Sequence, residues 1–206
     1  MWVGGAKRLV DALAAATLLL CALPLLVAHW LVVRVTVGRS ALFSQARLGK
    51  GGRVFVLWKL RTMTEARGED GQLLPDQERL TRTGRWLRRL SLDELPSLWN
   101  VLKGDMSFVG PRPLLPRYLE RYSPDQARRH EVRPGITGWA QVNGRNVTTW
   151  EKRFQLDLWY IDHCSFWLDV RIMAMTAWKV ITGEGVSAPG HATMPEFMGG
   201  SHDGRR

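Results

Sequence analysis

RRLSLDELPSLWNVLKGDMSFVGPRP, residues 88–113, is the stretch around which the rest of the chain is organised. It places two adjacent acids, Asp93 and Glu94, between a run of arginines and a rigid Pro-Arg-Pro segment. Apolar residues recur in it at helical intervals, which predicts a helix with one buried face formed by Leu92, Leu95, Trp99 and Leu102. The two acids therefore lie where a partly buried helix begins.

The exact start of this helix determines what the acids can do. Ser91 and Glu94 have the spacing of a capping box, but Pro96 fits only a first turn, so we expect the regular helix to begin at Asp93 or later. Asp93 would then lie at a helix N-terminus, where an ionised carboxylate and a phosphate are both favoured. That position suits a carboxylate nucleophile that attacks a phosphoryl group. An ordinary helix cap is the alternative.

Two further segments favour a site that binds phosphate. Pro111 and Pro113 restrict the backbone on both sides of Arg112, so its guanidinium projects from a stiff segment. Residues 133–145 read RPGITGWAQVNGR, with three glycines and a closing arginine, Arg145. This pattern is consistent with close approach of the backbone to a ligand, although by itself it indicates only a loop.

Three blocks of this sequence resemble the small monotopic phosphoglycosyl transferases, the bacterial sugar transferases that begin glycan assembly on a polyprenol carrier. The blocks are LSLDELPSLWNVLKGDMS, VGPRP and HEVRPGITGWAQVNGR. The resemblance covers nearly the whole chain, from residue 7 to about residue 199. Residues 185–199, GVSAPGHATMPEFMG, are most similar to the bacillosamine-type PglC branch of the family.

The resemblance implies that the chain transfers a sugar 1-phosphate from a UDP-sugar to polyprenol (undecaprenyl) phosphate. It makes Asp93 the nucleophile that carries the phosphosugar after UMP leaves, and it places Glu94 beside it to support the metal or the acceptor. The implied cofactor is Mg²⁺, with Asp93 as a metal contact, because Mg²⁺ is often held by one or two carboxylates plus substrate phosphates. The expected sugar is N-acetylated, such as diacetylbacillosamine, with galactose or glucose as alternatives.

The remaining expected substrate contacts are cationic. Residues 41–60 contain two strand-like runs around a glycine-rich turn, which predicts a β-hairpin. It ends in a block similar to the family's K-x-R-T-M, which implies that Lys59 and Arg61 line the active site; by pattern alone they could equally keep a strand edge soluble. Arg112 is the leading candidate for phosphate contact, and Arg88 and Arg145 join it.

One long apolar segment, residues 12–33, precedes the hairpin. At about 1.5 Å per residue it can just cross a hydrocarbon core of about 30 Å, so a spanning anchor is one interpretation. Cations flank both ends, so no direction of insertion is preferred. The resemblance implies instead a re-entrant helix-break-helix that returns to the cytoplasmic face. Its break would be Leu23-Pro24, where the family often has Ser-Pro, and Pro24 offers a place to bend.

Composition limits the partners. The net charge of +10 and a pI near 10.4 favour anionic partners, and the ten tryptophans favour a membrane interface. We expect no nucleic acid, because no recognised binding motif accompanies the arginines. The two cysteines indicate no disulfide framework and fit a reducing cytoplasmic setting.

The expected fold is α+β and mostly helical, on the cytoplasmic face of the bacterial inner membrane. A re-entrant membrane hairpin (1–38) precedes a catalytic domain (39–199) and a disordered terminus (200–206). One β-hairpin and amphipathic interfacial helices surround a small globular domain, and the polar loop at 65–81 is either a lid or an inert surface loop. A membrane-anchored binding protein on the same fold and a basic nucleic-acid-binding module are the other classes considered. The oligomeric state is left open.

Overall fold

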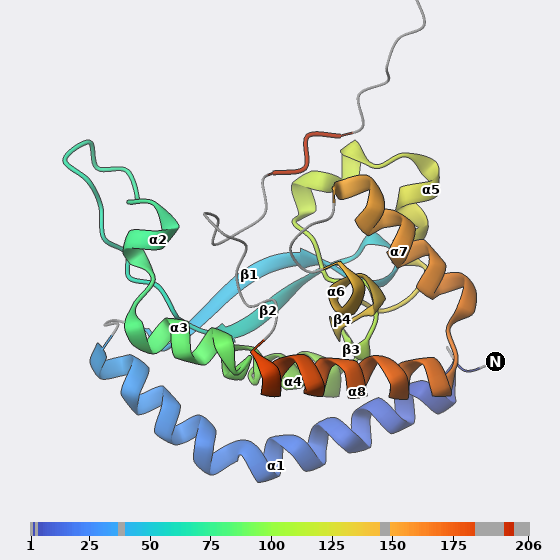
Figure 1. The fold of residues 1–206 in the computed structure, drawn as a ribbon, viewed down its shortest axis with the longest axis horizontal. Helices are drawn as coiled ribbons and strands as arrows, with labels where there is room; N and C mark the ends of the chain where they lie inside the picture. Colours follow the sequence, from blue (N-terminus) through green and yellow to red (C-terminus); the bar gives the residue numbers. More distant parts are fainter. Residues whose placement is uncertain (1, 3, 37–39, 145–148, 184–195, 200–206) are drawn as a thin grey trace, which may run out of the picture.

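A computed structural model describes residues 2, 4–36, 40–144, 149–183 and 196–199. The elements run from a long N-terminal helix through a β-hairpin and a projecting arm to a group of short helices, and the described chain is mostly helical, as expected (Figure 1). In order they are α1 Gly5–Thr36, β1 Leu42–Leu48, η1 Lys50–Gly52, β2 Val54–Leu60, α2 Asp76–Arg79, α3 Arg82–Arg89, η2 Leu92–Glu94, α4 Ser97–Lys103, β3 Ser107–Val109, η3 Pro116–Arg121, α5 Pro124–Ala127, η4 Arg128–His130, β4 Gly135–Thr137, α6 Trp139–Asn143, α7 Trp150–His163 and α8 Phe166–Thr182.

The apolar N-terminal segment forms one bowed helix. α1 continues through Pro24, so the expected interruption of the helix is absent. Proline removes one hydrogen bond and distorts the preceding turn, but the leucines, alanines and valines on either side keep the helix going. Figure 1 shows α1 curving with its convex side away from the rest of the molecule, and α3, α4 and α8 lie on its concave side.

Both ends of α1 contact the same body of the protein. Lys7 forms an ion pair with Asp169 of α8. Arg8 donates hydrogen bonds of 2.7 and 2.5 Å to two carbonyl oxygens in the last turn of α4. Near the other end, the His29 ring stacks on Trp86 of α3 with a centroid separation of 5.6 Å. The helix is therefore held along its length and not only at one terminus.

The β-hairpin is confirmed. β1 and β2 pair antiparallel from Leu42 opposite Leu60 to Leu48 opposite Val54. The connecting turn contains Gly51 at φ 66° and Gly52 at φ 72°, a backbone conformation that glycine adopts without steric cost.

α4 is joined to β2 by side chains one turn apart. Asn100 is fully buried; its Oδ1 accepts from the Trp58 N–H at 3.2 Å, and its Nδ2 donates to the Val56 carbonyl at 2.7 Å. The Ser97 hydroxyl donates to the Trp58 carbonyl at 2.8 Å. We call Ser97 and Asn100 the α4 clamp.

The predicted buried face of this helix is partly wrong. Trp99 is 51% exposed, whereas Leu98 and Val101 are the buried apolar residues of α4. The reason is that residues 92–94 form a 3₁₀ turn and the α-helix begins only at Ser97. A 3₁₀ turn has about three residues per turn and not 3.6, so a single helical phase cannot be carried across it.

Glycines of two predicted site segments pack against each other. A Cβ added to Gly135 would lie 2.2 Å from the Gly110 nitrogen, and one added to Gly138 would lie 2.2 Å from the Gly110 oxygen. β3 and β4 pair in parallel here, a pairing that was not predicted. Because the Gly135 N–H also donates to the Pro111 carbonyl at 3.0 Å, this crossing holds the Pro-Arg-Pro segment in place.

The helices after residue 149 and the polar loop at residues 65–81 match part of what the sequence predicts. The helical stretches after residue 149 form α7 and α8, whose buried Tyr160 and Ile172 pack in one core cluster, while Trp167 and Trp178 are 77% and 64% exposed.

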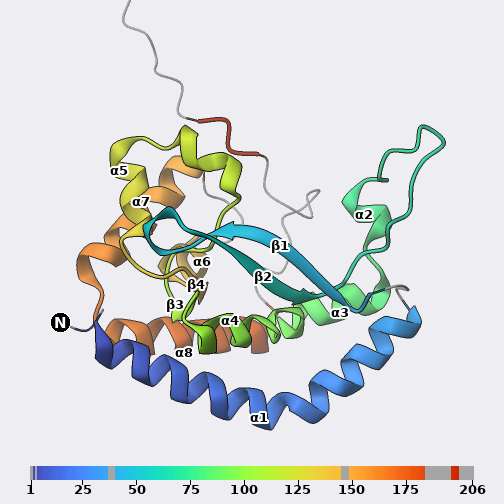
Figure 2. The ribbon, with the colours of Figure 1, turned by 180° about the vertical axis from the view of Figure 1, so that it is seen from behind.

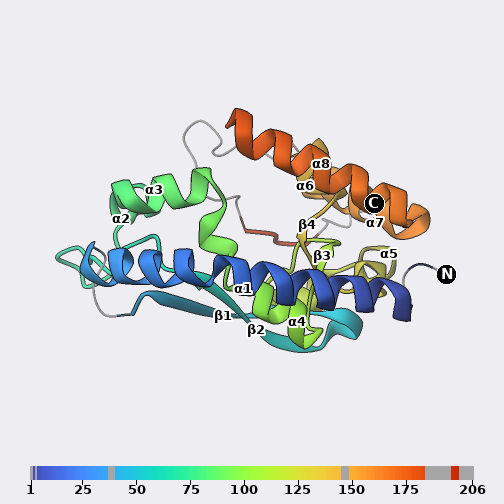
Figure 3. The same cartoon turned by 90° about the horizontal axis from the view of Figure 1, so that it is seen from below.

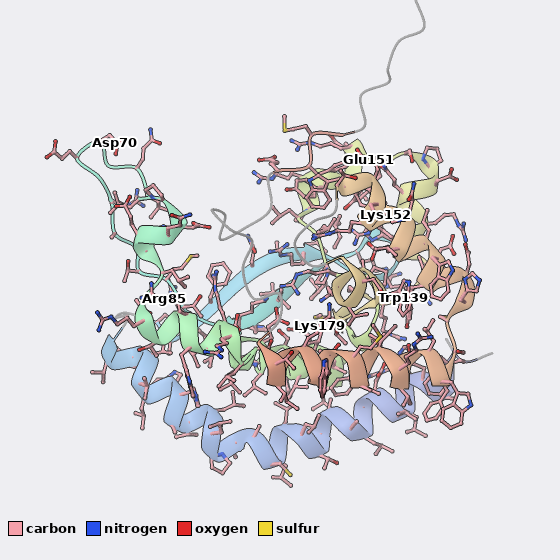
Figure 4. The ribbon with its side chains drawn as sticks, in the orientation of Figure 1. Asp70, Arg85, Trp139, Glu151, Lys152 and Lys179 are labelled. Carbon is pink, nitrogen blue, oxygen red and sulfur yellow. The ribbon has the colours of Figure 1, made fainter. Side chains whose placement is uncertain are left out.

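The polar loop forms an arm that projects from the body in Figure 2, with Asp70 at its tip in Figure 4. The predicted disordered terminus, residues 200–206, lies outside the described residues.

Candidate active site

The two acids emerge from a tight turn. Ser91 has φ 56°, and it is the one non-glycine residue with positive φ in the part of the chain that the structure describes. Its side chain makes no capping hydrogen bond, so the capping-box interpretation is wrong. Asp93 and Glu94 occupy the 3₁₀ turn η2, and Asp93 lies four residues before the first residue of α4. A left-handed serine is energetically unfavourable, and such residues cluster at functional sites.

Glu94 is held by two cations. Its Oε1 accepts hydrogen bonds from Lys59 Nζ at 2.5 Å and from Arg112 Nη2 at 2.8 Å. Burial by itself would raise the pKa of Glu94, but the charges and hydrogen bonds of Lys59 and Arg112 outweigh it and hold that pKa well below its usual range. Glu94 is therefore an ionised carboxylate that fixes the positions of two predicted substrate contacts.

Asp93 has a different environment from its neighbour. Its side chain is buried, and it accepts no hydrogen bond from any described residue. Burial and the adjacent Glu94 charge raise the pKa of Asp93, while Lys59, Arg88 and Arg112 oppose that rise. The carboxylate is thus surrounded by cations without being engaged by one, which leaves its oxygens available to a substrate.

The predicted cationic residues divide into three groups. Lys59 and Arg112 meet at Glu94. Arg88 lies beside these two cations, and its Nε donates to the Thr62 hydroxyl at 3.0 Å. Arg61 does not join them: it pairs with Glu65 at 2.6 Å and donates to the Ser40 carbonyl at 2.8 Å. Arg145 lies outside the described residues.

Sequence reasoning missed Arg47 of β1. Arg47 lines the same small pocket as Lys59, Glu94 and Arg112. The alternation of side chains along a strand could have indicated it, because positions 43, 45 and 47 lie on the hairpin face that also carries position 59.

A buried ion pair supports the Arg112 backbone. Arg129 is 3% exposed, and its Nη2 donates to the Arg112 carbonyl at 2.9 Å and to Asp157 of α7 at 2.8 Å. This pairing could not be found from sequence because it joins residues 28 positions apart.

The donor set fits Mg²⁺ only together with a substrate. Among the described residues, no three His, Cys, Asp or Glu side chains gather as a metal site. Glu94 is already engaged by two cations, so Asp93 is the one carboxylate of the pair free to contact a metal. Mg²⁺ commonly uses one or two carboxylates, with phosphates and waters completing its shell. Asp93 with a bound diphosphate would match that pattern.

The sequence matches the bacterial sugar transferase family over residues 2–183. It is 54% identical over 193 residues to the "Uncharacterized sugar transferase EpsL" of Bacillus subtilis (strain 168), covering 94% of this chain and 96% of that protein. It is 42% identical to the UDP-glucose:undecaprenyl-phosphate glucose-1-phosphate transferase of Xanthomonas campestris pv. campestris, covering 85% of this chain and 39% of that protein.

A third relative is the undecaprenyl-phosphate galactose phosphotransferase of Salmonella typhimurium (strain LT2), which is 36% identical over 87% of this chain and 41% of its own length. The chain thus spans about two-fifths of these two relatives with named activities. The family match covers almost the whole body described above, including the Asp-Glu turn and the cations around it. The chain therefore belongs to the bacterial sugar transferase family of enzymes.

Proposed function

We propose that the chain transfers a sugar 1-phosphate from a UDP-sugar to undecaprenyl phosphate through a phosphosugar carried on Asp93. The observation that supports this most directly is the buried Asp93 carboxylate, which has no hydrogen bond from the described residues and lies beside Lys59, Arg88 and Arg112. A nucleophile needs free oxygens, and a diphosphate needs cations to offset its charge. The name of the Xanthomonas relative gives the same donor class and acceptor, and the name of the Salmonella relative gives the same acceptor.

The proposed reaction has two displacements at one phosphorus atom. An Asp93 oxygen attacks the β-phosphorus, and the bond to the bridging oxygen breaks, so UMP leaves with that electron pair. A phosphate oxygen of undecaprenyl phosphate then attacks the same phosphorus and releases the Asp93 carboxylate, which yields undecaprenyl diphosphosugar. Mg²⁺, when bound, would offset charge on the diphosphate.

The cations have distinct parts in this reaction. Lys59 and Arg88 favour the ionised form of Asp93. Arg112 is fixed by Glu94 and is 40% exposed, so it can reach a phosphate while keeping its orientation. Charge develops on phosphate oxygens in both displacements, and preorganised donors stabilise it without moving.

The names of the relatives favour glucose or galactose as the sugar. Both appear in the names of relatives that match most of this chain. The amino-sugar prediction and the bacillosamine-type branch rested on residues 185–199, most of which lie outside the described residues. We therefore propose UDP-glucose or UDP-galactose as the donor, with an N-acetylated amino sugar as the alternative to be tested beside them.

We propose further that α1 enters the cytoplasmic leaflet of the inner membrane and returns, so that the protein is monotopic. The helix is long and apolar enough to cross a membrane, with a mean hydropathy of 2.3 and 11% of its apolar window buried. However, both ends contact one body, through Lys7 and through His29. In Figure 1 α8 lies next to α1 at the lower edge of that body, and Figure 3, seen from below, shows both helices running across the view; α8 adds the exposed Trp167 and Trp178.

The test is UMP release by the purified full chain with undecaprenyl phosphate, Mg²⁺ and a panel of UDP-glucose, UDP-galactose and UDP-N-acetylglucosamine. We expect UMP and lipid-linked sugar in equal amounts with one preferred donor, and a loss of about 10³-fold or more in Asp93→Asn. Activity that survives Asp93→Asn would overturn the covalent route. A protein that binds donor but releases no UMP with any of them would be a binding protein.

A further inference from the structure

Arg47 and Lys59 lie on one face of the β-hairpin. In the register, Arg47 is opposite Phe55 and Lys59 is opposite Phe43. Paired residues of antiparallel strands share a face, and so do alternate residues along each strand. Both cations therefore face the pocket that Glu94 lines, with Arg47 toward the turn end of the hairpin.

The Arg47 guanidinium is only partly satisfied. Its Nη1 donates to the Pro113 carbonyl at 3.1 Å and its Nη2 donates to Gln45 Oε1 at 2.5 Å, whereas its buried Nε has no partner among the described residues. A buried donor without a partner is unfavourable, and a bound acceptor would relieve that cost. Burial and the neighbouring Arg112 charge lower the pKa of Arg47 to about 10, so the group remains protonated at neutral pH.

The pocket has more positive than negative charge. Arg112 and Lys59 share Glu94 as their counter-ion, and no salt bridge joins Arg47 to any described carboxylate. A guanidinium that is held by neutral oxygens and lacks a counter-ion suits a phosphate oxygen, which can accept from it with a charge-assisted hydrogen bond.

The position of Arg47 distinguishes between the two phosphate-bearing substrates. Figure 1 shows the hairpin rising from α3, beside the end of α1, toward α5 and α7. The turn end lies against η4, where the His130 ring meets the Gly49 carbonyl at 3.2 Å. Because α1 is the segment proposed to enter the membrane, a lipid phosphate at the α1 end of the hairpin would meet Lys59 and Arg88 before Arg47.

We propose that Arg47 binds the α-phosphate of the UDP-sugar and stabilises the departing UMP. This assignment rests on the proposed transferase function and adds a residue to its donor site. Arg47 would act on the leaving group, while Asp93 acts on the β-phosphorus and the lipid phosphate enters from the other end of the pocket.

The test compares Arg47→Gln and Arg47→Lys with a matched control, Arg53→Gln, because Arg53 lies exposed on the same hairpin. The measurements are KM for the UDP-sugar, KM for undecaprenyl phosphate, kcat, product inhibition by UMP, and direct titration of UMP. In Arg47→Gln we expect the donor KM and the UMP inhibition constant to rise about tenfold or more, with the acceptor KM unchanged. Arg47→Lys should recover part of the loss, and the control should match the wild type.

Three results would overturn the proposal. A rise in the acceptor KM alone would assign Arg47 to the lipid phosphate. A lower kcat and a lower thermal midpoint with unchanged UMP affinity would mean that Arg47 only stabilises the fold through its hydrogen bond to Pro113. No change in any of the measured quantities would mean that Arg47 does not take part in binding or catalysis. If the wild type releases no UMP, the transferase proposal fails separately, and UMP titration of wild type and Arg47→Gln still decides whether Arg47 binds this phosphate.

Discussion

Asp93 and Glu94 are adjacent, yet the fold gives them opposite electrostatic environments. Glu94 accepts two charge-assisted hydrogen bonds, and its pKa is lowered; Asp93 accepts none from the described residues, and its pKa is raised. The sequence places both acids at one site, but it does not assign their partners, because Lys59 and Arg112 lie 35 and 18 residues from Glu94. The roles separate only when the hairpin and the Pro-Arg-Pro segment meet at the turn.

Asp93→Asn should stabilise the fold while it abolishes activity. Because the pKa of Asp93 is raised by folding, its stabilising contribution is present below the unfolded pKa of about 3.9 and is lost as pH rises through the folded pKa. At pH 7 the neutral amide avoids that loss, so we expect the thermal midpoint to rise by about 2 °C. The increase should shrink as the pH falls toward 4. A lower midpoint at pH 7 would show that the surrounding cations outweigh the burial of the carboxylate.

The pH at which kcat/KM falls on the acidic side of its profile, the acid limb, should shift in opposite directions in two variants. Activity requires ionised Asp93, so it is lost as pH falls through a pKa that lies above the usual range for aspartate. Arg88→Gln removes a charge that lowers this pKa, so the limb should move to higher pH. Glu94→Gln removes a charge that raises it, so the residual activity should show a limb at lower pH. Shifts in the same direction in both variants would contradict the assignment of Asp93 to this limb.

At the scale of elements, the α4 clamp sets the distance between the hairpin and the acidic turn. Asn100→Ala removes two hydrogen bonds to β2 and leaves the Trp58 N–H and the Val56 carbonyl without those partners. We expect a loss of about 2–4 kcal/mol in the free energy of unfolding, measured by denaturant titration, and a lower kcat. Ser97→Ala removes one bond and should cost less. An Asn100→Ala protein with unchanged kcat would show that the clamp does not position Glu94.

Elements that are determined by neighbouring residues could be predicted from the sequence, and those that depend on contacts between distant residues could not. The alternation and the glycines of residues 41–60 were sufficient for the hairpin. The spacing of apolar residues after Ser91 indicated a helix but concealed the 3₁₀ turn, because a left-handed serine leaves no periodic signal. The parallel pairing of β3 and β4 depends on backbone contact between Gly110 and Gly135, which neither segment reveals alone.

At the scale of the molecule, the contacts at both ends of α1 predict where those ends lie. In a protein lacking Cys21 and Cys164, single cysteines placed at Gly4 and at Ser40 should react with a membrane-impermeant thiol reagent from the same side of sealed vesicles. The reason is that Lys7 and His29 hold the two halves of the helix against one body. Labelling from opposite sides would mean that α1 spans the membrane and that one of these contacts is absent there.

The positions of the cations agree with a membrane contact on the α1 side of the molecule. Arg85 on α3 lies on the row of helices next to α1, whereas Glu151 and Lys152 lie at the start of α7, away from that row (Figure 4). Cations beside an apolar helix fit anionic headgroups, and the net charge of +10 adds a general attraction. The composition predicted an anionic partner, but only the fold indicates which side of the molecule would meet it.

The most direct test of the covalent route is the intact mass of the detergent-purified chain after incubation with Mg²⁺ and each UDP-sugar, without acceptor. We expect a mass gain of one phosphosugar with the preferred donor, accompanied by free UMP, and its removal when undecaprenyl phosphate is added. Asp93→Asn should gain no mass, and Arg53→Gln should behave as the wild type. Undecaprenyl diphosphosugar formed by a wild type that never carries the adduct, or an adduct that persists in Asp93→Asn, would contradict the assignment of Asp93 as the nucleophile.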